Sequence, residues 1–597
     1  FGNGMLLSKA ILLVAAFDHR HIFIDPEPDA AASWKERSRM FALPRSSWDD
    51  YDKSLISRGG GVWPRSAKTI KLPKAAAAAV GLEPGEYEPG PYVKAGHENN
   101  VAVGDPANDA VRVDASSVRA KVIGEGANLG VTQAGRIAFA LSGGRINTDF
   151  IDNSAGVDCS DHEVNIKIAL AAARRSGKLS EKARIALLAE MTDEGAAIVL
   201  EDNRLQALAL SIAETGGPRA MAAQLHLIET LETGGHLDRQ TEGLADSQSL
   251  VRRAADGQGL TRSELAVLLS SAKLVLQAAI EDSPLADDPA LTGTLVEAFP
   301  APMRSKFKAQ IAGHRLRREI IATKLANRII NRLGVIHPFE LAEEEGVGLG
   351  EVAAAFVTVE RLFGLPELWH ALDTVAMPEA ARLMLFDRLA AAVGNLMSDV
   401  LRTAAGQVRP GEMVADLGKG VTALIAGTGE LLSAESRNQS DRLRKSFAHS
   451  GAPDRLAARV AHLYDLDGSV GLARLARETG ISPVTLTRGF TGIGTALGLD
   501  WAQSTAALMN PSDVWERLLV DGLARDFQQM RLDLLRRLGK RKGGGKDLAG
   551  AVERWVGEHA VAVRQFRAMV ARAQAQTPVA PAMLAQIASM ARNLLAR

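Results

Sequence analysis

The residues best able to do chemistry open the chain. FGNGMLLSKAILLVAAFD, residues 1–18, has the order of a glycine-rich loop (Gly2 and Gly4), a short helix and a strand that ends in Asp18. A dinucleotide-binding βαβ unit has this order, because glycines and a helix N-terminus approach the pyrophosphate and an acid accepts hydrogen bonds from the ribose. Such an acid repels the 2′-phosphate of NADP, so Asp18 favours NAD. The alternative is a buried strand that merely ends in a charge.

A second stretch places glycines directly after an apolar run. KVIGEGANLGVTQAGRI, residues 121–137, leads from a short strand into Gly124, Gly126 and Gly130. Glycines in this position mark a place where a ligand can come close to the backbone. We therefore expect Gly126 and Asn128 to lie beside a bound ligand.

A third stretch ends an apolar run in polar side chains and then begins a helix. In NTDFIDNSAGVDCSDHEVNIKI, residues 147–168, Asp152-Asn153 and a small-residue turn precede a helix start with acids from Asp158 onward. Asn153 and Ser160 are suited to bind a polar ligand at the C-terminal edge of a strand. The alternative is a well-capped helix without a ligand.

Other catalytic and metal-binding signatures are weak. His19 and His21 are two residues apart, so on a strand Asp18 faces away from them and no metal triad results. The sequence has no G-x-S-x-G nucleophile motif. GKRKGGGKDLAG, residues 539–550, lacks the spacing of a phosphate-binding loop, so a flexible basic linker is expected. We predict that the chain holds no metal.

Composition limits the classes of function. The 597 residues carry 70 Lys and Arg against 70 Asp and Glu, which gives no general attraction to nucleic acid or to an anionic membrane. The single cysteine, Cys159, excludes an intrachain disulfide framework and indicates a reducing compartment, so we expect a cytoplasmic protein. No run approaches the roughly 18 uninterrupted apolar residues that span a bilayer, so no membrane is expected. Because the chain begins with Phe, we expect that it is part of a longer protein.

The elements that position the three stretches divide the chain into two regions. Residues 1–165 contain short β-like runs separated by Gly and Pro, which predicts an α/β domain, here a partial Rossmann-type dinucleotide-binding domain. Residues 166–597 have helical texture. In EIIATKLANRIINRLG, residues 319–334, apolar residues recur every three to four positions and Gly334 supplies a stop. We predict a large all-α domain after the α/β domain.

A weak internal repeat lies in the helical region. Residues 341–365 align without a gap with residues 475–499. Six residues recur 134 positions later: Leu341, Ala342, Gly346, Phe356, Gly364 and Leu365. The second copy alone is typical of a DNA-binding helix-turn-helix, but its second helix carries only Arg488 and the first copy is acidic, the wrong sign for phosphate contacts. Two similar helical hairpins are the preferred interpretation, and no nucleic acid partner is expected.

Together these stretches resemble the large class of bacterial NAD-dependent glutamate dehydrogenases, and the chain is similar to their C-terminal portion. The resemblance rests on residues 1–26, 41–70, 124–168 and 314–334, and it thins after about residue 400. Two motifs of the smaller hexameric glutamate dehydrogenases also have counterparts. E-G-A-N is similar to residues 125–128, and N-A-G-G-V-x-x-S-x-x-E is similar to NSAGVDCSDHE with one position exchanged.

The resemblance implies roles for residues and a reaction. It puts Asn153 on the nicotinamide-ribose side of NAD and Ser160 on the side-chain carboxylate of the substrate. The implied reaction converts L-glutamate, NAD and water to 2-oxoglutarate, NADH and ammonium, and a homo-oligomer is expected. In these enzymes the lysine that activates water and the aspartate that moves protons lie in a substrate domain upstream. We therefore expect no catalytic residue in this chain and no activity from it alone.

One departure from the family lies at residues 81–96. Family members carry a helix, a strand and a glycine-rich loop before V-K-A, whereas GLEPGEYEPGPYVKAG passes straight across. Loss of a central strand leaves backbone donors unpaired. The alternative function is therefore a non-catalytic helical scaffold or regulatory protein with a degenerate nucleotide-binding domain.

Overall fold

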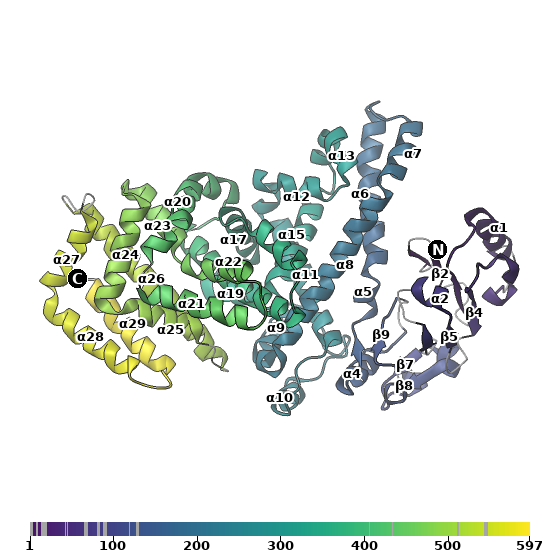
Figure 1. The fold of residues 1–597 in the computed structure, drawn as a ribbon, viewed down its shortest axis with the longest axis horizontal. Coiled ribbons are helices and arrows are strands. Elements are labelled where there is room, and N and C mark those ends of the chain that lie inside the picture. Colours follow the sequence, from purple (N-terminus) through teal and green to yellow (C-terminus); the bar gives the residue numbers. More distant parts are fainter. Residues whose placement is uncertain are drawn as a thin grey trace.

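The computed structural model describes most of the chain. Its described residues are 4–7, 10–13, 21–41, 43, 46–64, 70–79, 84–87, 92–118, 120–126, 130–404, 406–432, 434–509, 511, 513–541 and 547–597. Within them, every strand lies before Asn147 and the chain beyond is helical. The α/β region occupies one end of an elongated molecule, and the last helices lie at the other end (Figure 1). The predicted large all-α region is confirmed.

The described strands form four small sheets. An antiparallel sheet contains, in chain order, β1 (Gly4–Leu7), β2 (Ala10–Leu13), β3 (His21–Asp25) and β4 (Gly61–Pro64). A second antiparallel pair is β5 (Ile70–Leu72) with β6 (Gly85–Tyr87). The parallel pairs are β7 (Tyr92–Lys94) with β8 (Arg112–Asp114), and β9 (Val122–Ile123) with β10 (Arg145–Ile146). A Rossmann-type sheet requires parallel pairing, which among the described strands only the last two pairs have.

The opening stretch differs from the loop, helix and strand that its sequence predicts. Gly4 begins β1, which forms an antiparallel hairpin with β2 where a short helix is expected. Short apolar runs fit a strand and a buried helix equally well, and here the partner decides, because β2 also pairs with β3. Gly2, Asp18 and Asn128 lie outside the described residues.

The third stretch also differs from its prediction. The strand that was expected to reach Asn153 ends at Ile146, and α5 (Asp149–Asp152) and α6 (Ser154–Arg175) follow. The reason is a closed helical turn, since the N–H of Asn153 donates to the carbonyl of Asp149 at 2.8 Å. The helix therefore begins at Ser154 and not near Asp158. Because α6 runs through residue 165, no break marks the predicted domain boundary there, and the division into residues 1–165 and 166–597 stays a prediction.

The remaining helices of the α/β region are short. They are α1 (Ala30–Phe41), α2 (Lys74–Ala79), α3 (Asn100–Val103) and α4 (Gln133–Leu141). The first helices of the helical region are α7 (Glu181–Glu190), α8 (Thr192–Thr215), α9 (Met221–Thr233), α10 (Ser247–Ala255), α11 (Arg262–Asp282), α12 (Thr292–Glu297), α13 (Ala301–Lys306) and α14 (Lys308–Ala312).

The rest of the helical region contains two similar helical units. The first unit comprises α15 (Arg317–Leu333), α16 (His337–Glu345), α17 (Leu349–Leu362), α18 (Leu365–Thr374) and α19 (Glu379–Ala404). Between the units lie α20 (Pro410–Leu431) and α21 (Ala434–His449). The second unit comprises α22 (Asp454–Asp465), α23 (Ser469–Thr479), α24 (Pro483–Leu497), α25 (Leu499–Leu508) and α26 (Val514–Lys540). The chain ends with α27 (Leu548–Glu558), α28 (Ala560–Gln574) and α29 (Pro581–Leu595).

The predicted repeat is the hairpin at the centre of each unit. Gly346 ends α16 and Gly480 ends α23, with φ of 64° and 70°. Gly364 precedes α18 and Gly498 precedes α25, with φ of 61° and 76°. A glycine at positive φ lets a helix end and the chain turn without a Cβ clash. The interpretation as two helical hairpins is confirmed, and it extends to the flanking helices.

Helix α11 is a long, largely buried helix of the helical region. By length and composition it is the one helix in the described part of the chain that could cross a membrane. However, 61% of its apolar stretch is buried, and it packs against α8, α15 and α17. Leu268, Leu276 and Ile280 are fully buried in this core. The helix therefore has the burial of a core helix.

Candidate functional site

The second and third predicted stretches meet at one sheet edge. Because β9 and β10 are parallel, the loops that follow them leave the same edge. The backbone N–H of Glu125 donates to Asp152 Oδ2 at 2.9 Å. The side-chain amide of Asn147 donates to Asp152 Oδ1 at 2.7 Å. One carboxylate thus ties the loop after β9 to the loop after β10.

A buried ion network supports this edge. Arg136 of α4 donates from Nε to Glu125 Oε2 at 2.6 Å and from Nη2 to Glu125 Oε1 at 3.0 Å. It also contacts Asp149 at 2.9 Å, and the N–H of Val131 donates to Glu125 Oε1 at 3.1 Å. Burial raises the pKa of Glu125, against the lowering effect of Arg136. A bidentate pair fixes geometry as well as charge, so Glu125 holds the shape of the glycine-rich turn.

The helical region anchors the same edge. Arg262 of α11 donates to Asn147 Oδ1 at 2.7 Å and contacts Glu214 of α8 at 3.0 Å. Asn203 of α8 donates to the carbonyl of Ile151 at 2.9 Å and to Ser154 Oγ at 2.7 Å. The loops after β9 and β10 are therefore held from both sides.

The predicted site residues of α6 lie on one face of the helix. Asn153 precedes the helix and is half-buried, and Ser160 is exposed seven residues later. Seven residues make about two turns, so the two side chains share a face roughly 10 Å apart. A Cβ at Gly156, between them, would lie 2.8 Å from Asn153 Oδ1, so a larger residue there would displace the Asn153 amide. Gly126 is exposed, and a Cβ there would meet no atom within 4 Å, so the space beside it is open.

The opposite face of α6 rests on a layer of charged groups. His162 Nε2 lies 3.7 Å from Asp158 and 3.8 Å from Asp202 of α8. Lys324 of α15 lies 2.5 Å from Asp202 and 3.4 Å from His162. Burial raises the pKa of Asp158. The pKa of Asp202 is lowered, because the nearby imidazole of His162 and the charge of Lys324 outweigh its burial.

These groups could in principle hold a metal ion. One ligand atom from each of Asp158, His162 and Asp202 lies within 4.8 Å of the others. Imidazole and carboxylate are common ligands of divalent cations. However, the ammonium group of Lys324 already supplies a positive charge among them. In this structure the layer is an ion-pair network that holds α6 against α8 and α15.

A second lysine lies in the same layer. Lys273 of α11 donates to Gln206 Oε1 at 2.9 Å. Burial lowers the pKa of Lys273 to about 7, and the charge of Asp202 opposes that shift. Lys273 therefore loses its proton more readily than an exposed lysine. No local spacing in the sequence predicted this layer, because its residues come from four helices.

Known protein families match both the α/β region and the helical region of the chain. Residues 257–593 match the family described as "Glutamate dehydrogenase, C-terminal". Residues 1–90 and 88–213 match "Bacterial NAD-glutamate dehydrogenase, catalytic domain". The chain belongs to the bacterial NAD-specific glutamate dehydrogenase family. The resemblance predicted from the sequence is confirmed at the level of the family.

Three relatives of the family are similar over most of this chain. The NAD-specific glutamate dehydrogenase of Pseudomonas aeruginosa is 37% identical over 610 residues, which cover 98% of this chain and 38% of that protein. The Halomonas elongata enzyme is 37% identical over 582 residues (94% and 36%). The Mycobacterium tuberculosis enzyme is 40% identical over 491 residues (77% and 30%). The chain spans between 30% and 38% of the length of these relatives.

The catalytic-domain match of the glutamate dehydrogenase family is interrupted. Its two matched segments meet at residues 88–90, inside the stretch where the sequence predicts a lost helix and strand. The Pseudomonas aeruginosa alignment is 610 residues long although it covers 98% of these 597 residues, so that relative has residues with no counterpart here. The position of the break supports the predicted departure at residues 81–96, and the alignment length is consistent with residues lost from this chain.

Proposed function

We propose that the β9–β10 edge and the exposed face of α6 form part of the active site of an NAD-dependent glutamate dehydrogenase. The proposed reaction converts L-glutamate to 2-oxoglutarate and ammonium with reduction of NAD. The observation that supports it most is the hydrogen bond from Glu125 to Asp152, because it brings the two motif-bearing loops to one place. The printed names of the relatives support the same reaction.

The proposed roles follow the geometry of this edge. Open space beside Gly126 leaves room for a cofactor to approach the backbone. Asn128 is proposed as a cofactor ligand from the sequence motif alone. Asn153 offers its amide to the nicotinamide-ribose side of NAD. The hydroxyl group of Ser160 donates a hydrogen bond to the side-chain carboxylate of the substrate. NAD, when bound, supplies the acceptor for the hydride that leaves the substrate.

The proposed contacts to the rest of NAD come from the opening stretch. Gly2 and Gly4 approach the pyrophosphate, and Asp18 accepts from the ribose hydroxyls. The resemblance places the lysine and aspartate that handle protons in a substrate domain, so we do not expect turnover from this chain by itself. A homo-oligomer and a cytoplasmic location stay predictions.

Titration of NAD against the purified chain tests the proposal without requiring turnover. We expect Asn153→Ala and Asp18→Ala each to weaken NAD binding about tenfold or more, because each removes a hydrogen-bond partner of the cofactor. Asn165→Ala is the matched control, since it makes the same change twelve residues further along α6. Ser160→Ala is expected to leave NAD binding intact and to weaken 2-oxoglutarate binding in the presence of NADH.

The alternative function makes the opposite prediction. A helical scaffold with a degenerate nucleotide-binding domain does not bind NAD. Wild-type chain that fails to bind NAD, or binding that is indifferent to both Asn153→Ala and Asp18→Ala, favours the scaffold.

A further inference from the structure

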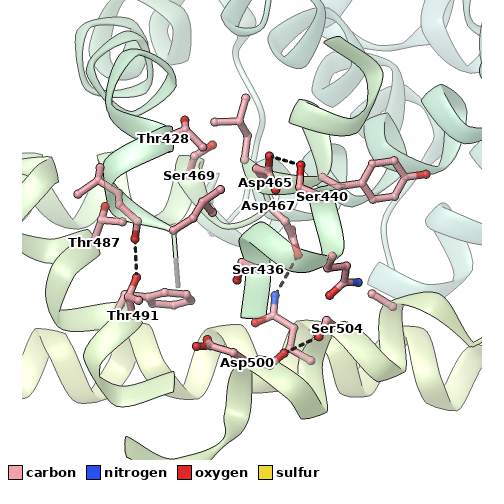
Figure 2. Close-up of a pocket in the computed structure, with 18 of the residues that line it drawn as sticks. Thr428, Ser436, Ser440, Asp465, Asp467, Ser469, Thr487, Thr491, Asp500 and Ser504 are labelled. Atoms are coloured by element: carbon pink, nitrogen blue, oxygen red, sulfur yellow. Dashed lines mark hydrogen bonds between the residues drawn. The ribbon is translucent and has the colours of Figure 1, made fainter. Parts of the chain in front are cut away.

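A polar cavity lies in the second helical unit, far along the chain from the β9–β10 edge. Its volume is about 160 Å³. Side chains from α19 to α26 line it, and Figure 2 shows those of Asp467, Thr491 and Asp500 around a common space. A cavity of this size holds several waters or one small molecule, since one water needs roughly 10–15 Å³.

The lining has an excess of negative charge. Its described charged residues are three aspartates, Asp465, Asp467 and Asp500, and one arginine, Arg531. Arg531 is 1% exposed, donates to Asp500 at 2.7 Å and stacks on the ring of Phe490 at 3.9 Å. One arginine leaves two of the three carboxylates without a balancing charge in the lining, so the cavity favours a cation.

The described hydrogen-bond partners of Asp467 are all neutral. It accepts from the amide of Gln503 at 3.1 Å, from the amide N–H of Gln528 at 3.3 Å and from the backbone N–H of Gly468. The charges of Arg525 and Arg531 also act on Asp467. However, these arginines make their short ion pairs with other acids, Glu344 and Asp500 respectively. Burial raises the pKa of Asp467 accordingly. A cation in the cavity would add a charged partner to these neutral ones.

A second observation is independent of the acids. Ser469 begins α23, lines the cavity and is 4% exposed. Its Oγ is buried and has no hydrogen-bond partner among the described residues. A buried hydroxyl without a hydrogen-bond partner costs stability. A bound molecule that hydrogen-bonds to Ser469 would remove that cost.

The first helical unit shows that the fold does not need this polarity. Each lining residue of the second unit has a counterpart 134 positions earlier, in the register of the repeat. Six polar or charged residues of the cavity correspond to buried apolar ones: Asp467 to Leu333, Ser469 to Val335, Thr487 to Ala353, Thr491 to Val357, Gln503 to Trp369 and Arg531 to Met397. Asp465 corresponds to a buried polar residue, Asn331. The same helices can therefore be filled largely with apolar side chains.

The cavity also joins two hydrophobic clusters. Leu443, Tyr464 and Leu466 on its walls belong to the cluster that begins at Ile151. Leu424 and Leu472 belong to the cluster that ends at Leu595. A molecule in the cavity would contact both clusters, so its binding would stabilise their junction.

We propose that this cavity is a binding site for a small molecule that carries a protonated amine and a hydroxyl or similar polar group. The amine meets Asp467 and Asp465, and the polar group meets the hydroxyl of Ser469. The proposal does not depend on the function proposed for the β9–β10 edge.

Three probes of equal length test the charge preference. They are 4-amino-1-butanol (a cation at neutral pH), 1,4-butanediol (neutral) and 4-hydroxybutyrate (an anion), measured on the whole chain by ligand-observed NMR. We expect 4-amino-1-butanol to bind, and the other two to bind about tenfold more weakly or not at all, because a charge-assisted contact is lost. Equal binding of all three, no binding, or a preference for the anion would overturn the proposal.

Variants locate the binding. Asp467→Asn is expected to weaken 4-amino-1-butanol binding about tenfold, since it removes one charge and keeps the shape. Asp441→Asn on α21 is the matched control, because Asp441 is exposed and outside the cavity lining. Unchanged affinity of Asp467→Asn would place the binding elsewhere.

A second variant guards against loss of folding. Ser469→Val with Thr491→Val installs the counterpart residues Val335 and Val357, which the first unit buries in the same hairpin. We expect this variant to fold and to lose binding of 4-amino-1-butanol. A folded variant that still binds the probe with wild-type affinity would overturn the proposal.

Discussion

The two helical units have the same turns but differ in the polarity of their interiors. Both end their second helix at a glycine with positive φ, and both turn into their fourth helix at another. Yet Met397 is fully buried among apolar residues where Arg531 lies beside a polar cavity. The turns and the helix period fix the arrangement of the helices, whereas the residues between the helices are free to differ. The interior of a repeated unit is therefore where function can diverge.

The largest expected effect comes from placing the charge of the second unit in the first. Met397→Arg buries a guanidinium without a carboxylate partner, which we expect to cost about 3–5 kcal/mol in free energy of unfolding. Chemical unfolding followed by far-UV circular dichroism measures the loss. Met397→Leu is the control and is expected to cost less than about 1.5 kcal/mol. A well-tolerated Met397→Arg would mean that the first unit is not tightly packed.

Replacing the arginine of the second unit with the methionine of the first should cost somewhat less free energy of unfolding. Arg531→Met leaves Asp500 without its partner at 2.7 Å, and we expect a loss of about 2–4 kcal/mol. Adding Asp500→Asn removes the unpaired charge and should restore part of that stability. If the double variant is no more stable than Arg531→Met, the ion pair is not the reason for the arginine.

Asp399 and Asp533 occupy the same position in the two repeats, and we expect only Asp399 to make stability depend on pH. Asp399 of α19 accepts from the N–H groups of Val470 and Gly471 at the start of α23. Burial, with the nearby charge of Asp467, raises the pKa of Asp399 to about 7. Its counterpart Asp533 is exposed and pairs with Arg536 at 2.8 Å.

The sign of the effect follows from the raised pKa. Between about pH 4 and pH 7 the folded state holds a proton on Asp399 that the unfolded state has released, so this group's contribution to stability falls as pH rises. Asp399→Asn cannot titrate. We expect the melting temperature of Asp399→Asn relative to wild type to increase from pH 5 to pH 8. Asp533→Asn should show no such trend, and a similar trend in both variants would contradict the assignment.

The smallest effect should be the same in both units. Gly346→Ala and Gly480→Ala each place a Cβ at positive φ, although no atom lies within 4 Å of either added carbon. We expect each to cost about 1 kcal/mol from backbone strain alone. Thermal unfolding of the two variants checks this, and a clearly unequal loss would show that the two turns are not equivalent.

Local patterns predicted much of the helical region. The 3–4 spacing of apolar residues and the glycine stops were enough for helices such as α15, and the repeat of Gly346 and Gly364 predicted the hairpins. Short apolar runs in the α/β region were harder, because a run such as that before Asp152 fits a strand or a helix. The partner decides between them, and the partner is not visible in a local window.

The candidate site was predicted only as separate pieces. The sequence predicted the motifs around Gly126 and Asn153, but it did not predict the residues that hold these motifs in place. Glu125 has no role in the sequence prediction, although an acid between Gly124 and Gly126 with Arg136 eleven residues later is compatible with an ion pair. Arg262, which reaches Asn147 across 115 positions, has no local signal at all. Supports of this kind depend on tertiary packing.

The buried helix α11 has a consequence for synthesis of the protein. It is long and apolar enough to cross a membrane, and the helices that cover it include α8, made earlier, and α15 and α17, made later. A ribosome must therefore extend the chain past Leu333, and then past Leu362, before the apolar surface of α11 is enclosed. During that interval the nascent chain presents a segment that chaperones and the membrane-insertion machinery both recognise by hydrophobicity.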